Sequence, residues 1–193
     1  GAFFVHDQDG WRLRGHARQG FFRWMASWAM ALKSPADLGY DGSRFQLPEL
    51  NIQDEIVETD GWKRGGGLLY GKLGGITGRS EARKSTVDAR IDRALKIARL
   101  MKGQGLIWCG LNSESSGIAK RLNGSGIEVY GGLSAEEKVQ RILDFVSGKY
   151  RMMVSKAKIT GFGLNLQNAR WMIFLGLSDS YESYYQCIRR VWR

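Results

Sequence analysis

Three polar side chains near the end of the chain have the spacing of a single helix face. Gln186, Arg190 and Arg193 follow one another at intervals of four and three residues, which places them on one side of an α-helix. Arginine suits the stabilisation of a phosphoryl group in transfer, because its planar guanidinium donates to two oxygens at once. The alternative is a solvated basic face near a helix C-terminus, where positive charge is mildly favourable.

A second candidate for phosphate chemistry is the segment Ser155–Arg170, "SKAKITGFGLNLQNAR", which follows an apolar stretch. Lys156 and Lys158 lie where phosphates could be held, and Gly161 and Gly163 allow backbone to approach a ligand closely. The alternative for this segment taken alone is an ordinary connection between two strands, with its glycines serving turns.

The stretch Gly66–Lys72 fits the phosphate-loop pattern G-x-x-x-x-G-K, but we reject it. Leu73 stands where a serine or threonine must reach magnesium, and the flanking residues predict neither the strand before nor the helix after such a loop.

Hydrophobic periodicity predicts the elements that carry these side chains. A helical stripe runs from Val87 to Met101, and further helices are predicted from Asn112, from Ser134 and from Asp179-Ser180. The second of these opens on a capping box, "SAEE", and should turn a face of four residues inward: Val139, Ile142, Leu143 and Val146. The last should seat itself through another four: Tyr181, Tyr185, Ile188 and Trp192.

Buried strands are predicted between these helices at 105–111, 127–130, 150–155 and 171–177. The regular alternation predicts an α/β fold, a parallel sheet with helices on both faces. The last strand, "WMIFLGL", is apolar on both faces, which is typical of a central parallel strand. Ligands bind such sheets at the carboxyl ends of the strands, so we expect the site in the loops that leave those ends.

The first third of the chain has a different organisation. Apolar residues at Phe22, Met25, Ala29 and Leu32 predict a helix that Pro35 ends. An extended segment should follow over 45–58, and the dense glycine of 61–78 predicts a loop or a weakly ordered insert.

Composition narrows the class of partner. The net charge is +10, and 60–105 supplies +7 of it, from eleven Lys/Arg against four Asp/Glu. So basic a chain usually binds nucleic acid or another polyanion, although a generally basic surface remains the alternative. No segment predicts a membrane span or a signal peptide. The two cysteines, Cys109 and Cys187, lack metal-ligand spacing, so we expect reduced thiols and no metal site formed by them.

Four segments in order resemble the second RecA-like lobe of superfamily-two helicases. They are "GLIWCGLN", "VYGGLSAEEKVQRILDFVSG", "VSKAKITGFGLNLQNA" and "SDSYESYYQCIRRVWR". The third is similar to motif V and the last to motif VI, Q-x-x-x-R-x-x-R, of Swi/Snf-type double-stranded-DNA translocases, in particular a phage-associated branch. "LIWCGLN" lies where motif IV should be. The resemblance is strong over 85–193 and weak over 1–60.

The resemblance implies a role for each part of the site. In this family the motif VI arginines reach the phosphates of ATP-Mg²⁺ bound on the first lobe when the two lobes close. It implies catalytic roles for Arg190, Arg193 and Gln186. It implies nucleotide contacts near Gly161, Gly163 and Asn165. It implies contacts to the backbone of double-stranded DNA from Asn112, Ser155, Lys156, Lys158 and Thr160. Arg189 departs from the motif, which commonly has a small or acidic residue there.

The resemblance also implies a division of the chain. We expect the end of the first lobe and the crossover between lobes in 1–60, a glycine-rich basic insert or linker in 61–84, and the second lobe in 85–193. The phosphate loop and the magnesium carboxylates belong to the first lobe, so we expect this chain to be a fragment that does not hydrolyse ATP alone. A cytoplasmic protein of bacterial or phage origin, without membrane attachment, would fit these expectations.

Two other functions stay open from the sequence. A non-enzymatic nucleic-acid-binding module fits the charge and the aromatic content. A lobe of an RNA helicase fits the same fold, although "GFGLNLQNA" is more similar to the DNA-translocase form of the motif.

Overall fold

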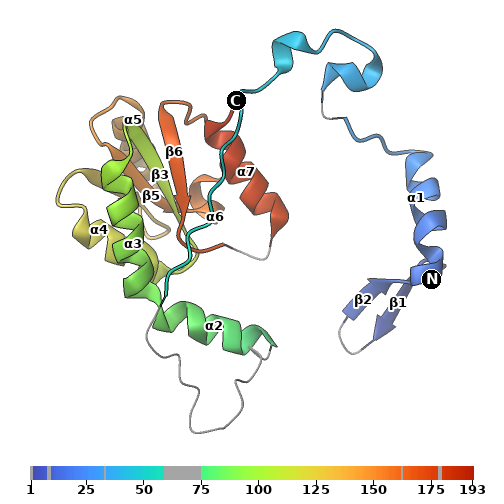
Figure 1. The fold of residues 1–193 in the computed structure, drawn as a ribbon, viewed down its shortest axis with the longest axis horizontal. Helices are drawn as coiled ribbons and strands as arrows, with labels where there is room; N and C mark the ends of the chain where they lie inside the picture. The colour runs from blue at the N-terminus through green and yellow to red at the C-terminus, as the bar shows by residue number, and fades with distance from the viewer. Residues whose placement is uncertain (1, 8–9, 33, 59–74, 162, 178–179) are drawn as a thin grey trace, which may run out of the picture. The chain divides into compact units, whose positions relative to one another are not determined.

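A computed structural model describes the chain except residues 1, 8–9, 33, 59–74, 162 and 178–179 (Figure 1). The chain divides into two compact units, Gly1–Leu47 and Pro48–Arg193, and each is described by itself. The rejected phosphate-loop pattern at 66–72 lies outside the described residues, as does most of the glycine-rich segment. The expectation that no helix follows the pattern was wrong, because helix α2 (Gly75–Ser85) begins within the last residues of that segment. The predicted division at 60 and 84 stays a prediction.

The first unit is a small hairpin followed by one helix. Strands β1 (Phe4–Asp7) and β2 (Gly10–Leu13) pair antiparallel, and α1 spans Arg18–Ala26. A short 3-10 turn at Gly15–Ala17 precedes α1, and two more follow it at Pro35–Leu38 and Ser43–Phe45. Aromatic rings of α1 pack edge to face on the hairpin side, with Phe21 5.2 Å from Phe4 and 5.6 Å from Phe3 between ring centroids.

The predicted extent of the first helix was wrong, because α1 ends at Ala26 rather than at Pro35. The Ser27 hydroxyl donates to the Trp24 carbonyl at 2.7 Å, a local bond that competes with continued helix. Within this unit Phe22 and Leu32 are also exposed. A helix draws most of its stability from packing of its apolar face, and this stripe has little to pack on here.

The second unit is built on a four-stranded parallel sheet of order β4-β5-β3-β6. Its strands are β3 (Gln104–Cys109), β4 (Gly126–Val129), β5 (Met152–Lys156) and β6 (Ala169–Phe174). All four were predicted within a few residues, and the predicted α/β class is confirmed. The carboxyl ends of the strands meet at one edge of the sheet, where their loops lie.

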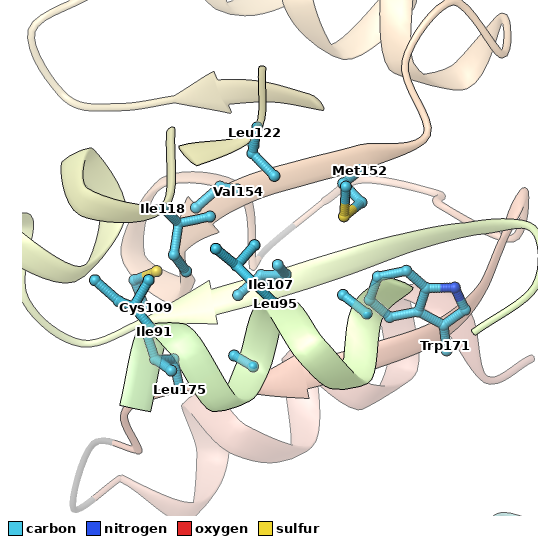
Figure 2. Packing of buried hydrophobic residues seen from close by; sticks show 12 residues of the cluster. Ile91, Leu95, Ile107, Cys109, Ile118, Leu122, Met152, Val154, Trp171 and Leu175 are labelled. Carbon is cyan, nitrogen blue, oxygen red and sulfur yellow. The ribbon is translucent and has the colours of Figure 1, made fainter. Parts of the chain in front are cut away.

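Helices cover both faces of this sheet (Figure 1). The helices of the unit are α2 (Gly75–Ser85), α3 (Val87–Leu100), α4 (Asn112–Arg121), α5 (Ala135–Val146), α6 (Ala157–Thr160) and α7 (Tyr181–Val191). Residues of α3 and α4 pack on one face with Ile107, Val154 and Trp171 (Figure 2). Residues of α5 and α7 pack on the other face with Leu106 and Met153. Alternate residues of β3 therefore belong to opposite clusters, as the pleat requires.

The predicted central position of the last strand was wrong. In the described sheet β6 pairs with β3 at the edge, and β3 is the strand with neighbours on both sides. Both faces of β6 are apolar because helices cover both. Trp171 packs in the cluster with α3, and the Phe174 ring lies 5.0 Å from that of Tyr184 on α7. Coverage by helices, rather than a central place, explains its composition.

The predicted inward face of α5 was also wrong, although its start was right. Ser134 and Glu137 form the expected capping box, with bonds of 2.8 and 3.1 Å. Phe145 is the fully buried residue of this helix, whereas Val139, Leu143 and Val146 are exposed and Ile142 is half-buried. The helix has apolar residues on two sides, and the larger ring turns inward.

The irregular segment 48–58 contacts two parts of the second unit, the residues just after α7 and helix α3. The Trp192 indole donates to the Pro48 carbonyl at 2.7 Å, and Glu55 pairs with Arg93 of α3 at 2.7 Å. Among the described helices, none is long and apolar enough to cross a membrane.

Candidate nucleotide and nucleic-acid site

Helix α7 starts where predicted but turns a different face to the sheet. The Ser180 hydroxyl caps it by accepting from the Ser183 amide at 3.2 Å. The predicted seating stripe was right for Ile188, which is buried, but wrong at its start: Tyr181 is 76% exposed and stacks on the exposed Tyr185. The buried residues of the helix are Cys187, Ile188 and Arg190.

Arg190 can be buried because its guanidinium finds oxygen partners inside the unit. The residue is 7% exposed. Its Nη1 donates to the Leu164 carbonyl at 2.8 Å, Nη2 to Gln186 Oε1 at 2.8 Å, and Nε to the Gln186 carbonyl at 3.0 Å. Burial, together with the charge of Arg193, lowers the pKa of Arg190 from its ordinary value. A buried cation needs such partners, and here they come from its own helix and the loop before β6.

That loop carries the residues predicted to contact nucleotide. The Leu166 amide donates to the Arg190 carbonyl at 2.9 Å, so Asn165 lies between two residues bonded to Arg190. Gly163 has φ +73°, a left-handed conformation that glycine adopts without strain. Gly161 is buried at the end of α6. The structure thus brings the predicted motif V loop and the predicted motif VI helix into direct contact.

Arg193 has a different environment from Arg190. It is exposed, and its Nε donates to the Arg189 carbonyl at 3.1 Å. The Arg189 guanidinium lies over the Trp192 ring, 5.5 Å from the centroid. Helix α7 ends at Val191 and Trp192 is extended, so Arg193 lies just beyond the helix and the prediction that it shares a helix face with Gln186 and Arg190 was wrong. The Trp192 indole connects this segment to the Pro48 carbonyl.

Two residues predicted to contact DNA meet at the carboxyl edge of the sheet. The Lys156 ammonium donates to Asn112 Oδ1 at 2.9 Å. Asn112 follows β3 and Lys156 ends β5, and these strands are neighbours in the sheet. Lys158, on α6, is exposed close by in sequence. The result is a cationic, amide-bearing surface suited to phosphate oxygens.

The other two residues predicted to contact DNA lie beneath that surface. Ser155 is buried, and its hydroxyl donates to the Val129 carbonyl at 2.7 Å, which connects the ends of β5 and β4. Thr160 is fully buried, and its Oγ1 has no hydrogen-bond partner among the described residues. In this conformation neither side chain reaches the surface.

Glu114, a buried carboxylate close to Asn112, was not predicted from the sequence as part of the site. Glu114 is 1% exposed and pairs with Arg90 of α3. It accepts from the Gly110 and Leu111 amides at 2.8 and 3.0 Å. Leu111 occupies the N-cap position of α4, where its apolar side chain offers no acceptor. Glu114, three residues later, therefore supplies the acceptor. A glutamate at that spacing was the available signal.

The basic residues at the carboxyl edge of the sheet, and Arg193 after α7, suit an anion better than a metal. Arg193, Lys156 and Lys158 are cations that fit phosphate oxygens. Within the described ranges, no three His, Cys, Asp or Glu residues gather as a metal site. These residues could contact the phosphates of ATP-Mg²⁺, but the described carboxylates do not form a magnesium cage.

The parallel α/β sheet with helices on both faces has the architecture of a RecA-like lobe. The family described as the helicase conserved C-terminal domain matches residues 89–193, more than half of the chain. The chain belongs to this family.

Several solved structures are similar to part of this chain. Saccharomyces cerevisiae Dbp5 bound to RNA and ADP-BeF3 has 16% identity and a TM-score of 0.49, over 54% of this chain and 29% of Dbp5. The C-terminal part of the Fun30 ATPase domain has 17% identity and a TM-score of 0.48, over 59% and 45%. The yeast DEAD-box splicing factor Prp28 has 16% identity and a TM-score of 0.49, over 54% and 24%. No curated protein gives a significant match.

Proposed function

We propose that this chain is the C-terminal lobe of an ATP-dependent double-stranded-DNA translocase of the Swi/Snf-type group, in its phage-associated branch. A first RecA-like lobe in the same complete protein would bind ATP and Mg²⁺, and residues 1–60 would include the end of that lobe. The protein would work in the cytoplasm of a bacterium, encoded by it or by a phage. This chain alone would not hydrolyse ATP.

On the nucleotide side, we expect Arg190 and Arg193 to have different roles. Arg193 is the exposed one, so it would contact the β- and γ-phosphates when the lobes close. Arg190 uses its guanidinium on Leu164 and Gln186, so it would hold α7 against the motif V loop. Backbone near Gly161, Gly163 and Asn165 would face the nucleotide from that loop. ATP-Mg²⁺ supplies the transferable phosphoryl group, and this lobe supplies positive charge to it.

On the DNA side, the observation that carries the proposal is the hydrogen bond between Lys156 Nζ and Asn112 Oδ1. Residues 44 positions apart, from two separate motifs, form one polar surface at the sheet edge. Lysine has three donors, so the bond to Asn112 leaves Lys156 able to contact a phosphate oxygen as well. Lys158 would extend this contact along the backbone, independently of base sequence.

In this proposal, Ser155 and Thr160 would support the DNA-contacting residues from the interior of the unit. The Ser155 bond to Val129 holds the end of β5, where Lys156 begins the loop. Thr160 ends α6, the helix that carries Lys158. Direct contact of either side chain with DNA would need a change of conformation.

Binding of labelled duplex DNA by this chain, across a series of salt concentrations, tests the DNA assignment. Lys156→Ala and Lys158→Ala should each weaken binding and reduce the slope of log K against log [salt] by about 1. Lys120→Ala is the matched control, since Lys120 is an exposed lysine in the last turn of α4 and removes the same charge. Slopes that stay equal to that of the control would contradict the assignment.

Competition with duplex RNA separates the DNA translocase from an RNA helicase lobe. Duplex DNA should displace the labelled probe at lower concentration than RNA of the same sequence. Stronger competition by RNA would favour the RNA helicase. A non-enzymatic module would bind either polymer, but Arg193 would then be irrelevant to ATP hydrolysis in the complete protein.

A further inference from the structure

Glu114 is a buried carboxylate whose two oxygens have different partners. Oε1 pairs with the Arg90 guanidinium. Oε2 accepts from two backbone amides of the loop after β3, Gly110 at 2.8 Å and Leu111 at 3.0 Å. This loop leads directly to Asn112, so one side chain fixes the backbone of both residues before the proposed DNA contact.

Arg90 connects the same carboxylate to two other parts of the unit. Its Nη1 also donates to the Leu175 carbonyl at 2.6 Å, just after β6, and its Nη2 donates to the Arg83 carbonyl in α2. The ends of β3 and β6 therefore share one charged centre.

The loops around this centre are packed against it. A Cβ placed on Gly176 would lie 2.8 Å from Glu114 Oε2 and 3.1 Å from the Gly110 amide nitrogen. Such approaches are too close for an ordinary side chain, so Gly176 lets the loop after β6 lie directly on the carboxylate. The carboxylate cannot shift without moving the loop of Gly110 and Leu111.

Burial of an ion pair is by itself weak support for a role in stability, because desolvation offsets much of the attraction. The partners of Glu114 indicate a more specific role. Both amides that it holds belong to the loop of Asn112, and both bonds are local to the DNA-facing edge of the sheet.

We propose that Glu114 is a positioning residue for DNA binding. It holds the loop from Gly110 to Asn112 in the conformation that presents Asn112, with Lys156, to the DNA backbone. This inference rests on the proposed function, because it presumes that Asn112 contacts DNA.

Glu114→Gln is the informative substitution because glutamine has one acceptor oxygen where glutamate has two. In either orientation of the glutamine side chain, its NH2 group faces either the Arg90 guanidinium or the Gly110 and Leu111 amides, so two hydrogen-bond donors face each other. The loop should loosen, and duplex DNA binding by the chain should weaken about fivefold to tenfold, the effect of one mismatched buried bond. Simple removal of a negative charge near a polyanion would strengthen binding, so the sign separates the two effects.

A double-mutant cycle with Asn112→Ala makes the test specific. Asn112→Ala should weaken binding by a similar factor, and adding Glu114→Gln to it should cause little further loss. Multiplicative losses would show that Glu114 acts on folding or elsewhere, and would overturn the inference. No loss from Asn112→Ala would instead refute the proposed DNA contact itself.

Glu137→Gln is the matched control. Glu137 has the same position in the capping box of α5, where it accepts from the Ser134 amide at 2.8 Å. Its substitution by glutamine removes the same charge. It should leave DNA binding unchanged or slightly stronger. A loss equal to that from Glu114→Gln would overturn the inference, since the effect would not depend on the Asn112 loop.

Gly176→Ala provides a second variant in case Glu114→Gln does not fold. Its methyl group displaces the Glu114 carboxylate without removing any charge from the protein. It should weaken DNA binding in the same direction, and the loss should again vanish in the Asn112→Ala background. Wild-type affinity for Gly176→Ala would overturn the inference.

Discussion

Arg190 and Leu164 are joined by a bond from the guanidinium Nη1 to the backbone carbonyl at 2.8 Å. A second bond runs the other way, from the Leu166 amide to the Arg190 carbonyl at 2.9 Å. The last helix and the loop before β6 are therefore joined by hydrogen bonds in both directions. If this loop faces nucleotide, as we propose, any shift of α7 is passed to the nucleotide contacts.

Replacement of Arg190 should destabilise the lobe, whereas replacement of Arg193 should not. Arg190→Ala removes three hydrogen bonds and leaves the Leu164 carbonyl without its donor, so we expect a loss of about 2–4 kcal/mol in the free energy of unfolding. Arg193→Ala removes an exposed side chain and should change it by less than about 0.5 kcal/mol. Urea unfolding followed by tryptophan fluorescence measures both. Equal effects of the two substitutions would contradict the assigned burial.

Packing of Trp171 over Gly105 gives a prediction about the core. A Cβ on Gly105 would lie 2.1 Å from the Trp171 ring, across the pair β3 and β6. Gly105→Ala must displace the indole and should lower the free energy of unfolding by about 1–3 kcal/mol.

Gly131→Ala is the control for this prediction, since Gly131 has open space around its Cα. Thermal unfolding should show a clear drop in Tm for Gly105→Ala and little change for Gly131→Ala. A Gly105→Ala protein as stable as the control would mean that the ring does not lie on this glycine.

The cysteines should be unreactive in the folded protein. Burial raises the pKa of the Cys187 thiol to about 12 and also raises that of Cys109. Thiolate is the reactive form, so neither thiol should react with a colorimetric disulfide reagent at neutral pH, and both should react in urea. Rapid reaction of the folded protein would contradict their burial.

The same shifts predict a pH dependence of stability. The thiol of an unfolded chain titrates at about pH 8.5. This is below the pKa of Cys187 in the folded protein, so the folded state keeps the proton that the unfolded state releases. The contribution of these thiols to stability is complete below about pH 8.5 and is lost as pH rises toward the folded pKa. Urea unfolding at increasing alkaline pH should show this fall, and Cys187→Ala should reduce its slope.

Local signals predicted the four strands of the second unit and its helices α3, α4, α5 and α7, but not α2 or α6. The capping box of α5 needs two residues three positions apart, and β3 is a short apolar run, so nearby residues suffice to indicate both. The meeting of Asn112 and Lys156 also followed from a simple rule, because loops at the carboxyl ends of neighbouring parallel strands share one edge.

The orientation of the helices depended on partners far away in sequence. Arg190 turns inward and donates a hydrogen bond to a carbonyl 26 residues earlier, a partner that no periodicity within α7 can indicate. The edge position of β6 likewise depends on the order of strands in the sheet. Glu114 was overlooked because its importance arises from Arg90 on another helix and from the approach of Gly176.

ATP hydrolysis with and without duplex DNA, in a complete protein that joins this lobe to its first lobe, tests the central claim most directly. Arg193→Ala should abolish DNA-stimulated hydrolysis, by about 10³- to 10⁵-fold, while Arg99→Ala, which removes an exposed arginine of α3, should have no effect. Hydrolysis by Arg193→Ala at the wild-type rate would contradict the assignment of this lobe as the donor of the arginine that completes the ATP site.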